Sequence, residues 1–157
     1  MVLIMLKLIN KHIEDNLPFL MDKKLLVCVS GGVDSMVLLN LLHRMNLNVS
    51  VAHCNFELRN KESDNDSIFV KDLCKISSIP FYSKNFDTNI PQHSVQMSAS
   101  KLRYDWLYEL LELHKYDFIL TAHHLNDSIE TFLINLTRST GIDLSLIHIS
   151  EPTRLLA

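Results

Sequence analysis

Short apolar runs alternate with segments of helical periodicity along the chain, and this alternation restricts the fold more than any other feature. Residues 25–29 (L-L-V-C-V) form a continuous apolar run, which is typical of a strand covered on both faces. Repeated strand–helix units predict an α/β fold, a doubly wound parallel sheet in a Rossmann-like, three-layer α/β/α arrangement. The predicted strands are 25–29, 49–53, 79–83 and 117–121, and the predicted helices are 3–16, 35–45, 63–77, 94–114 and 124–138.

Composition excludes several classes of protein. The length of 157 residues fits one domain, and the formal net charge of −3 shows no global basic excess for nucleic acid. The three cysteines form no C-x-x-C pair, which indicates reduced thiols in a cytoplasmic protein, not a disulfide framework. The apolar N-terminus carries Lys7 and Lys11 and lacks a cleavage site, so we interpret it as an amphipathic helix; no apolar run is long enough to span a membrane.

The segment S-G-G-V-D-S at 30–35 lies where the first predicted strand gives way to a helix. Adjacent glycines permit unusual backbone conformations and let N–H groups approach a ligand. Together with the positive end of the helix, they would form a phosphate cradle. Asp34 would repel a phosphate unless a divalent cation lay between them; the alternative is that it simply caps the helix. The loop matches neither the Walker motif nor the dinucleotide fingerprint.

Two more polar segments follow predicted strands, at the edge of the sheet where such folds bind ligands. They are A-H-C-N-F-E-L-R at 52–59 and T-A-H-H-L-N-D-S-I-E-T at 121–131. In the second segment, Asp127, Glu130 and Thr131 have the spacing of one helix face. A zinc site is not favoured, because adjacent histidine side chains diverge and no cysteine is close.

In order, these motifs resemble those of tRNA(Ile)-lysidine synthase, a family of PP-loop ATP-pyrophosphatases. S-G-G-V-D-S matches S-G-G-x-D-S, and residues 52–59 resemble V-H-x-N-H-x-L-R. Residues 94–106 resemble S-x-Q-x-x-A-R-x-x-R-Y-x-W, and the block beginning at Thr121 resembles T-A-H-H-x-D-D-x-x-E-T. The departures from the family pattern are Phe56, Ser100, Asn126 and Ser139.

The resemblance implies an adenine nucleotide alpha hydrolase-like catalytic domain at 1–143. We expect residues 144–157 to be a tail outside the family pattern, artefactual or disordered. The family activity is ATP-dependent joining of free L-lysine to C2 of the wobble cytidine in an isoleucine tRNA with a CAU anticodon. It proceeds through an adenylated intermediate, releases pyrophosphate and AMP, and uses ATP and Mg²⁺. A homodimer of the full-length protein is left open. Two alternatives are a tRNA-thiolating PP-loop enzyme and a catalytically impaired nucleotide-binding fragment.

The resemblance also implies roles for individual residues. The implied catalytic residues are Asp34, Arg103, His124 and Asp127, and the implied metal ligands are Asp34 and Asp127. The implied ATP-binding residues are Ser30, Gly31, Gly32, Val33, Asp34, Ser35, His53, Asn55, Arg59, Thr121, His123, Glu130 and Thr131. Without the motifs, Arg103 would be interpreted as a solvated helix residue and the two histidines as structural. Trp106 is predicted to belong to the core, because leucines share its helix face. The base that deprotonates the lysine amine is not identified.

Overall fold

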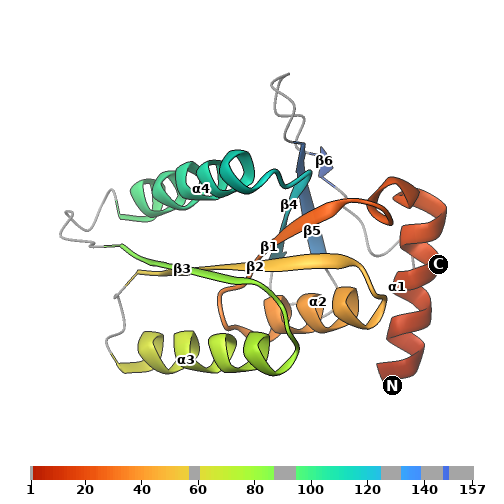
Figure 1. Ribbon diagram of the computed structural model, residues 1–157, viewed down its shortest axis with the longest axis horizontal. Helices are drawn as coiled ribbons and strands as arrows, with labels where there is room; N and C mark the ends of the chain where they lie inside the picture. The colour runs from red at the N-terminus through yellow and green to blue at the C-terminus, as the bar shows by residue number, and fades with distance from the viewer. Residues whose placement is uncertain (1, 57–60, 87–94, 125–131, 139–146, 149–157) are drawn as a thin grey trace.

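The computed structural model describes residues 2–56, 61–86, 95–124, 132–138 and 147–148, and its strands form one sheet (Figure 1). The strand order is β3-β2-β1-β4-β5-β6. The strands are β1 (Lys24–Cys28), β2 (Asn48–Asn55), β3 (Phe81–Asn85), β4 (Phe118–His124), β5 (Phe132–Arg138) and β6 (Ile147–His148). β3, β2, β1 and β4 are mutually parallel along the sheet, which confirms the doubly wound arrangement.

The order of the strands reverses between β1 and β4. The chain moves outward from β1 to β2 and β3, and then returns to place β4 on the other side of β1. At the carboxyl end of β1, Cys28 is in register with Ala52 of β2 and with Thr121 of β4. Ligands of open α/β sheets bind beyond the carboxyl ends of the strands at such a switch point. The fold therefore places the candidate site beside Cys28.

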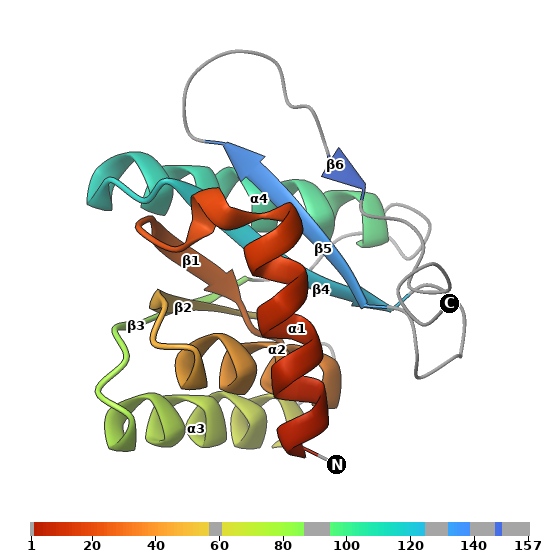
Figure 2. The same cartoon turned by 90° about the vertical axis from the view of Figure 1, so that its right-hand side faces the viewer.

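Helices cover both faces of the sheet (Figures 1 and 2). The helices are α1 (Val2–Asn16), η1 (Pro18–Leu20), α2 (Val33–Arg44), α3 (Lys61–Ile76) and α4 (Val95–His114). Leu25 and Val27 pack with α1, α2 and α3 in one core, whereas Leu26 packs with α4 in the other. This alternation is the two-residue period of a strand buried on both faces. Trp106 is 8% exposed in the α4 core, as predicted.

Three helices end in the same way. Asn46, Ser78 and Lys115 have φ values of 57°, 55° and 58°, and they follow α2, α3 and α4. The next N–H in each case donates to the carbonyl five residues earlier, for example Ile79 N to Cys74 O at 2.8 Å. This is the Schellman C-cap, a position at which glycine is usual. Here the chain turns from helix to strand with non-glycine residues.

The helix predicted over 124–138 is wrong for the residues that the structure describes. Residues 132–138 form β5, which runs antiparallel to β4, with His124 in register with Phe132. His123 and His124 accordingly belong to the end of β4 and do not begin a helix. The run F-L-I-N-L is short, and periodicity alone does not distinguish a short apolar strand from a helix, while Phe, Ile and Thr favour strands. None of the helices in the described ranges has the length and apolar character needed to cross a bilayer.

Candidate functional site

The glycine loop between β1 and α2 needs glycine at one position in particular. Gly31 has a φ of +92°, in the region that side chains with a Cβ rarely adopt. A Cβ added there would lie 2.9 Å from the Cβ of Asp66 on α3. Gly32 has a φ of −70° and a ψ of 160°, and an added Cβ would meet only the Ser30 hydroxyl at 3.3 Å. The prediction that this turn requires glycine is thus confirmed at Gly31.

Hydroxyl groups brace the loop from inside. The Ser35 hydroxyl donates to the Gly32 carbonyl at 3.0 Å, and the Gly32 N–H donates to Ser30 Oγ at 3.2 Å. Because the Ser35 proton is engaged, the Ser30 hydroxyl donates to Ser35 Oγ across 3.2 Å, and Ser35 Oγ also accepts from the Ser30 N–H. Ser35 is buried, so in this arrangement it holds the loop in shape.

The start of α2 is open to an anion. Gly32 is the N-cap, and among the described residues no side chain forms a capping hydrogen bond there, so the first-turn N–H groups lie at an uncapped positive end of the helix dipole. Val33, the first residue of α2, is 78% exposed, so this first turn of the helix is accessible from solvent. Asp34 is the second helical residue, half-buried in the first turn, and is not the N-cap residue. This position does not support the alternative interpretation of Asp34 as a simple cap.

Within the described part of the chain, three buried polar atoms near the carboxyl ends of the strands have no hydrogen-bond partner: His53 Nε2, Asn55 Oδ1 and Thr121 Oγ1. All three residues are predicted ATP-binding residues, and each is at most 4% exposed. The other nitrogen of His53 donates to the Val29 carbonyl at 2.7 Å, and the Asn55 amide donates to Asp64 at 3.3 Å. Buried polar groups are rarely left unpaired, so an unpaired set at the switch point indicates a place for a polar ligand.

Arg103 reaches the same end of the sheet from α4. Its guanidinium carbon lies 5.3 Å from the centroid of the Phe56 ring, just after β2. The pKa of the Cys28 thiol is lowered, first by a hydrogen bond from Cys54 and also by the charge of Arg103, against the effect of burial. The pKa of Cys54 is raised, because its thiol hydrogen-bonds to Cys28 and is buried. These interactions place Arg103 beside the carboxyl ends of β1 and β2.

Several predicted residues lie outside the described part of the chain. Arg59, Asp127, Glu130 and Thr131 are among them, and only the backbone of His123 and His124 is described. Within the described ranges, no group of three or more His, Cys, Asp or Glu side chains is placed to hold a metal ion. Mg²⁺ typically takes one or two carboxylates together with substrate phosphates and water. Asp34, at the start of α2, fits that donor set.

Sequence reasoning missed two features of the site. At the start of α3, Asp64 accepts a hydrogen bond from Asn55, and Asp66 approaches Gly31, which is 35 residues earlier in the sequence. Cys28 and Cys54 do not form a C-x-x-C motif in the sequence, but they lie on adjacent strands that bring their thiols into hydrogen-bonding contact. The strand order would have been needed to find either feature. The sequence did single out Phe56, because it departs from the family pattern, but its contact with Arg103 was not predicted.

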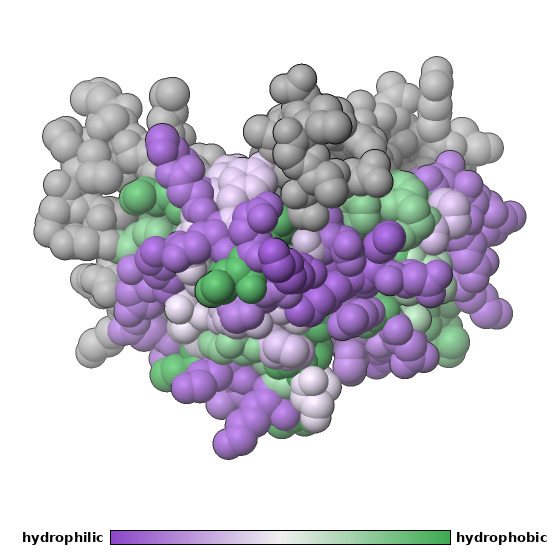
Figure 3. Space-filling model, turned by 45° about the horizontal axis from the view of Figure 1, so that its top comes forward, coloured by the Kyte–Doolittle hydropathy of each residue, from purple (hydrophilic) through white to green (hydrophobic). Residues whose placement is uncertain are grey.

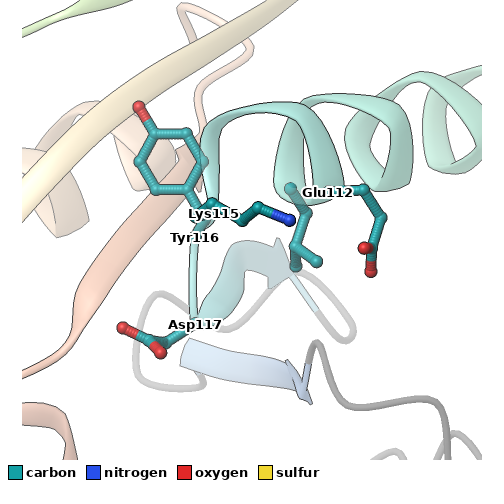
Figure 4. A pocket seen from close by; sticks show the side chains of 5 residues that line it. Glu112, Lys115, Tyr116 and Asp117 are labelled. Atoms are coloured by element: carbon teal, nitrogen blue, oxygen red, sulfur yellow. The ribbon is translucent and has the colours of Figure 1, made fainter.

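A separate pocket of about 280 Å³ lies at the opposite end of the sheet, where α4 leads into β4 (Figure 4). Its lining includes Glu112, Lys115 and Asp117, so it carries both signs of charge. Asp117 accepts a hydrogen bond from the Lys24 backbone N–H at 2.8 Å, which ties β1 to β4 there. This pocket is therefore not part of the candidate site.

Hydrophilic side chains dominate the face shown in Figure 3, with apolar ones interspersed.

The sequence profile of the PP-loop domain family matches residues 5–155. The chain belongs to the PP-loop family. The glycine loop, the parallel sheet and the unpaired polar atoms described above are thus parts of a PP-loop domain.

This PP-loop domain is similar to curated tRNA(Ile)-lysidine synthases. It is 43% identical over 136 residues to that of Bacteroides thetaiotaomicron, covering 84% of this chain and 32% of the relative. It is 40% identical over 144 residues to that of Petrotoga mobilis, covering 87% of this chain and 46% of the relative. These similarities confirm the resemblance drawn from the motifs. The chain spans about a third of the length of the first curated relatives it matches.

Solved structures support the fold of the PP-loop domain. NH3-dependent NAD synthetase from Campylobacter jejuni superposes with a TM-score of 0.52 at 18% identity, covering 75% of this chain and 53% of that chain. NMN synthetase from Francisella tularensis superposes with a TM-score of 0.55 at 16% identity, covering 72% of this chain and 50% of that chain. At these identities the likeness shows the fold alone, and it confirms the predicted fold class.

Proposed function

We propose that this PP-loop domain is the ATP-binding catalytic domain of a tRNA(Ile)-lysidine synthase. The observation that carries the proposal is the unpaired set of His53 Nε2, Asn55 Oδ1 and Thr121 Oγ1 beside an uncapped helix N-terminus. The names of the similar curated proteins supply the reaction. The proposed substrates are ATP, free L-lysine and an isoleucine tRNA with a CAU anticodon, and the proposed location is the cytoplasm.

In this proposal the backbone of the glycine loop binds the pyrophosphate portion of ATP. Gly31 and Gly32 allow close approach, and the first-turn N–H groups of α2 donate to phosphate oxygens. Asp34 would hold Mg²⁺, with Asp127 as the proposed second carboxylate. The metal ion, when bound, would neutralise charge on the phosphates as pyrophosphate leaves. Asp34 by itself would repel a phosphate bound there, so in this proposal a cation lies between the two groups.

Arg103 would supply the second positive charge at the site. A guanidinium binds phosphate oxygens through two N–H groups and stays charged throughout the pH range of activity. Adenylation of the cytidine base, followed by attack of the lysine amine, requires charge stabilisation and alignment of the reactants more than a protein nucleophile. His53, Asn55 and Thr121 would orient the nucleotide through their unpaired buried atoms. Arg59, His123, His124, Glu130 and Thr131 keep their proposed roles from the family motifs.

The test is ATP–pyrophosphate exchange by the intact protein with its tRNA. Asp34→Asn should lower exchange by about 100-fold or more, as loss of one group that stabilises charge in a transition state commonly does. Asp72→Asn on the exposed face of α3 is the matched control and should exchange like the wild type. Exchange by Asp34→Asn at the wild-type rate would overturn the proposal. Mass spectrometry of the tRNA would then identify lysidine as the product.

One observation favours a second candidate, tRNA thiolation. The Cys28 and Cys54 thiols are in contact next to Arg103, although the sequence spacing had suggested no cysteine pair. Sulfur-transferring enzymes use paired or activated thiols. The same mass spectrometry separates the two candidates, because a thiolated nucleoside in place of lysidine would support this one. Nucleotide binding without any tRNA product would favour the third interpretation, a catalytically impaired domain.

A further inference from the structure

Three aromatic rings form a continuous column between the sheet and α4. Phe56 follows β2, Phe86 follows β3, and their ring centroids are 4.8 Å apart at an interplanar angle of 17°. Phe86 in turn meets Trp106 of α4 edge-on, with centroids 6.1 Å apart. Phe86 and Trp106 are buried, whereas Phe56 is half-buried at the outer end. Stacked and edge-on aromatic contacts of this kind have defined geometry, so the column fixes the Phe56 ring relative to α4.

Arg103 completes the column. It lies three residues before Trp106 in α4, so both residues are on the same side of the helix. The guanidinium carbon of Arg103 is 5.3 Å from the Phe56 centroid, within the range of a cation–π contact. The same helix therefore contacts the column at its buried end through Trp106 and at its outer end through Arg103.

Besides this contact, Arg103 hydrogen-bonds to the Cys54 thiol, and because a guanidinium has five N–H donors, this bond does not use all of them. Among the described residues, Arg103 forms no ion pair with a carboxylate, whereas nearby Lys101 pairs with Asp105 at 2.6 Å. A guanidinium in contact with a ring can still make a planar, two-point contact with an anion through N–H donors at its edge. A lysine at this position would lack both the planar guanidinium and its fixed arrangement of N–H donors.

The column also sets Arg103 at the switch point. Cys54, two residues before Phe56, is in hydrogen-bonding contact with Arg103. The positive charge of Arg103 also lowers the pKa of Cys28 at the end of β1. Cys28 lies two residues before the glycine loop begins at Ser30. The guanidinium is thus at the end of the sheet where the proposed phosphate site lies.

We propose that Phe56 is a positioning residue, whose ring holds the guanidinium of Arg103 ready for a phosphate group bound at the glycine loop. The inference rests on the proposed function, since the phosphate is taken to be that of ATP. Phe56 stands where the related motif has histidine, and a phenyl ring gives Arg103 a neutral stacking surface in place of a second ionisable group.

A double-mutant cycle in the intact protein tests the inference. The variants are Phe56→Leu, Phe56→Tyr, Arg103→Gln and the double variant Phe56→Leu/Arg103→Gln, measured by ATP–pyrophosphate exchange. We expect Phe56→Leu to lower kcat about tenfold, with a smaller change in KM for ATP, and Phe56→Tyr to retain activity because its ring still stacks. In the Arg103→Gln background, Phe56→Leu should have no further effect, because the group it positions is gone.

One further measurement and one control variant separate this role from simple packing. NMR shifts of the Arg103 side chain should show the ring current of Phe56, retained in Phe56→Tyr and lost in Phe56→Leu. Phe69→Leu, at a phenylalanine of α3 that is 57% exposed, is the matched control and should change neither readout. An equal loss of activity from Phe56→Leu in both backgrounds, or no loss in either, would overturn the inference. A wild-type protein without exchange would instead overturn the proposed function, and the inference with it.

Discussion

The Nδ1 atom of His53 donates a hydrogen bond to the backbone carbonyl of Val29 across 2.7 Å, so a buried side chain of β2 holds the residue just before the glycine loop. The ring stacks on Phe81 of β3, with centroids 6.4 Å apart. Its other nitrogen, Nε2, has no hydrogen-bond partner among the residues that the structure describes. One histidine therefore links the shape of the loop to a free hydrogen-bonding position in the proposed nucleotide site.

These two functions of His53 can be separated by substitution. Asparagine places an amide N–H near the position of Nδ1 and lacks an equivalent of Nε2, whereas leucine lacks both groups. We expect His53→Leu to lower the free energy of unfolding by about 1–3 kcal/mol, because the Val29 carbonyl loses its buried partner. His53→Asn should unfold closer to the wild type in urea but bind ATP more weakly by calorimetry. Wild-type ATP affinity in both variants would contradict a nucleotide contact at Nε2.

Gly31 and Gly32 offer a matched pair of alanine substitutions. Gly31→Ala combines a left-handed φ with a Cβ 2.9 Å from Asp66 Cβ, so we expect a loss of about 1–3 kcal/mol in unfolding free energy. Gly32→Ala has an ordinary φ and meets only the Ser30 hydroxyl, so its loss should stay below about 1 kcal/mol. Urea titration of both variants checks the difference. Equal destabilisation would mean that the loop is not held as described.

The Cys28 thiol should titrate differently when its neighbours change. Its pKa is lowered by the hydrogen bond from Cys54 and by the charge of Arg103, so Cys54→Ala and Arg103→Gln should each raise it. Thiolate absorbance near 240 nm, followed against pH, measures the change. The control is Cys74→Ser, which removes a distant thiol whose pKa is raised to about 11 by burial. An unchanged Cys28 titration in both variants would argue against the contacts at this end of the sheet.

Alkaline pH should destabilise the fold through Tyr116. Burial, as the largest cause, raises the pKa of Tyr116 from 10.0 to about 12. An acid with a raised pKa in the folded state contributes its stability fully below pH 10, and loses it as the pH rises from about 10 to about 12. Unfolding midpoints in urea at several pH values should therefore fall across this window.

Tyr116→Phe tests the assignment. Its hydroxyl donates to Tyr82 at 3.1 Å, so the variant should be less stable at neutral pH by about 1 kcal/mol, but should show a weaker decline above pH 10. Tyr82→Phe removes one group that raises the Tyr116 pKa but leaves burial, the largest cause, so this variant should keep part of the decline. A full alkaline decline in Tyr116→Phe would assign the effect to another group.

The sequence was enough to predict the parallel sheet and the glycine loop, since both depend on local patterns. The apolar run before Ser30 and the glycine pair identify a strand, a tight turn and a helix within a few residues. The core role of Trp106 followed from the leucines on its helix face. Strand β5 was mistaken for helix, because the spacing of its apolar residues fits either structure and its pairing with β4 is not local.

Contacts between segments distant in sequence were not predictable. The approach of Asp66 to Gly31 joins α3 to the first loop, and the cation–π contact of Arg103 with Phe56 joins α4 to the end of β2. Both depend on which strands are neighbours and how the helices lie over them. The boundary of the domain at residue 143, and the roles of Arg59, Asp127, Glu130 and Thr131, stay predictions.

The left-handed C-caps at Asn46, Ser78 and Lys115 have a consequence for how this domain can change over time. All three lie at the amino ends of the strands that follow them, away from the edge where the proposed site lies. Glycine at any of these corners would relieve a strained backbone angle without entering that edge. A stabilising substitution at one of these corners would therefore lie at the opposite edge of the sheet from the proposed nucleotide site.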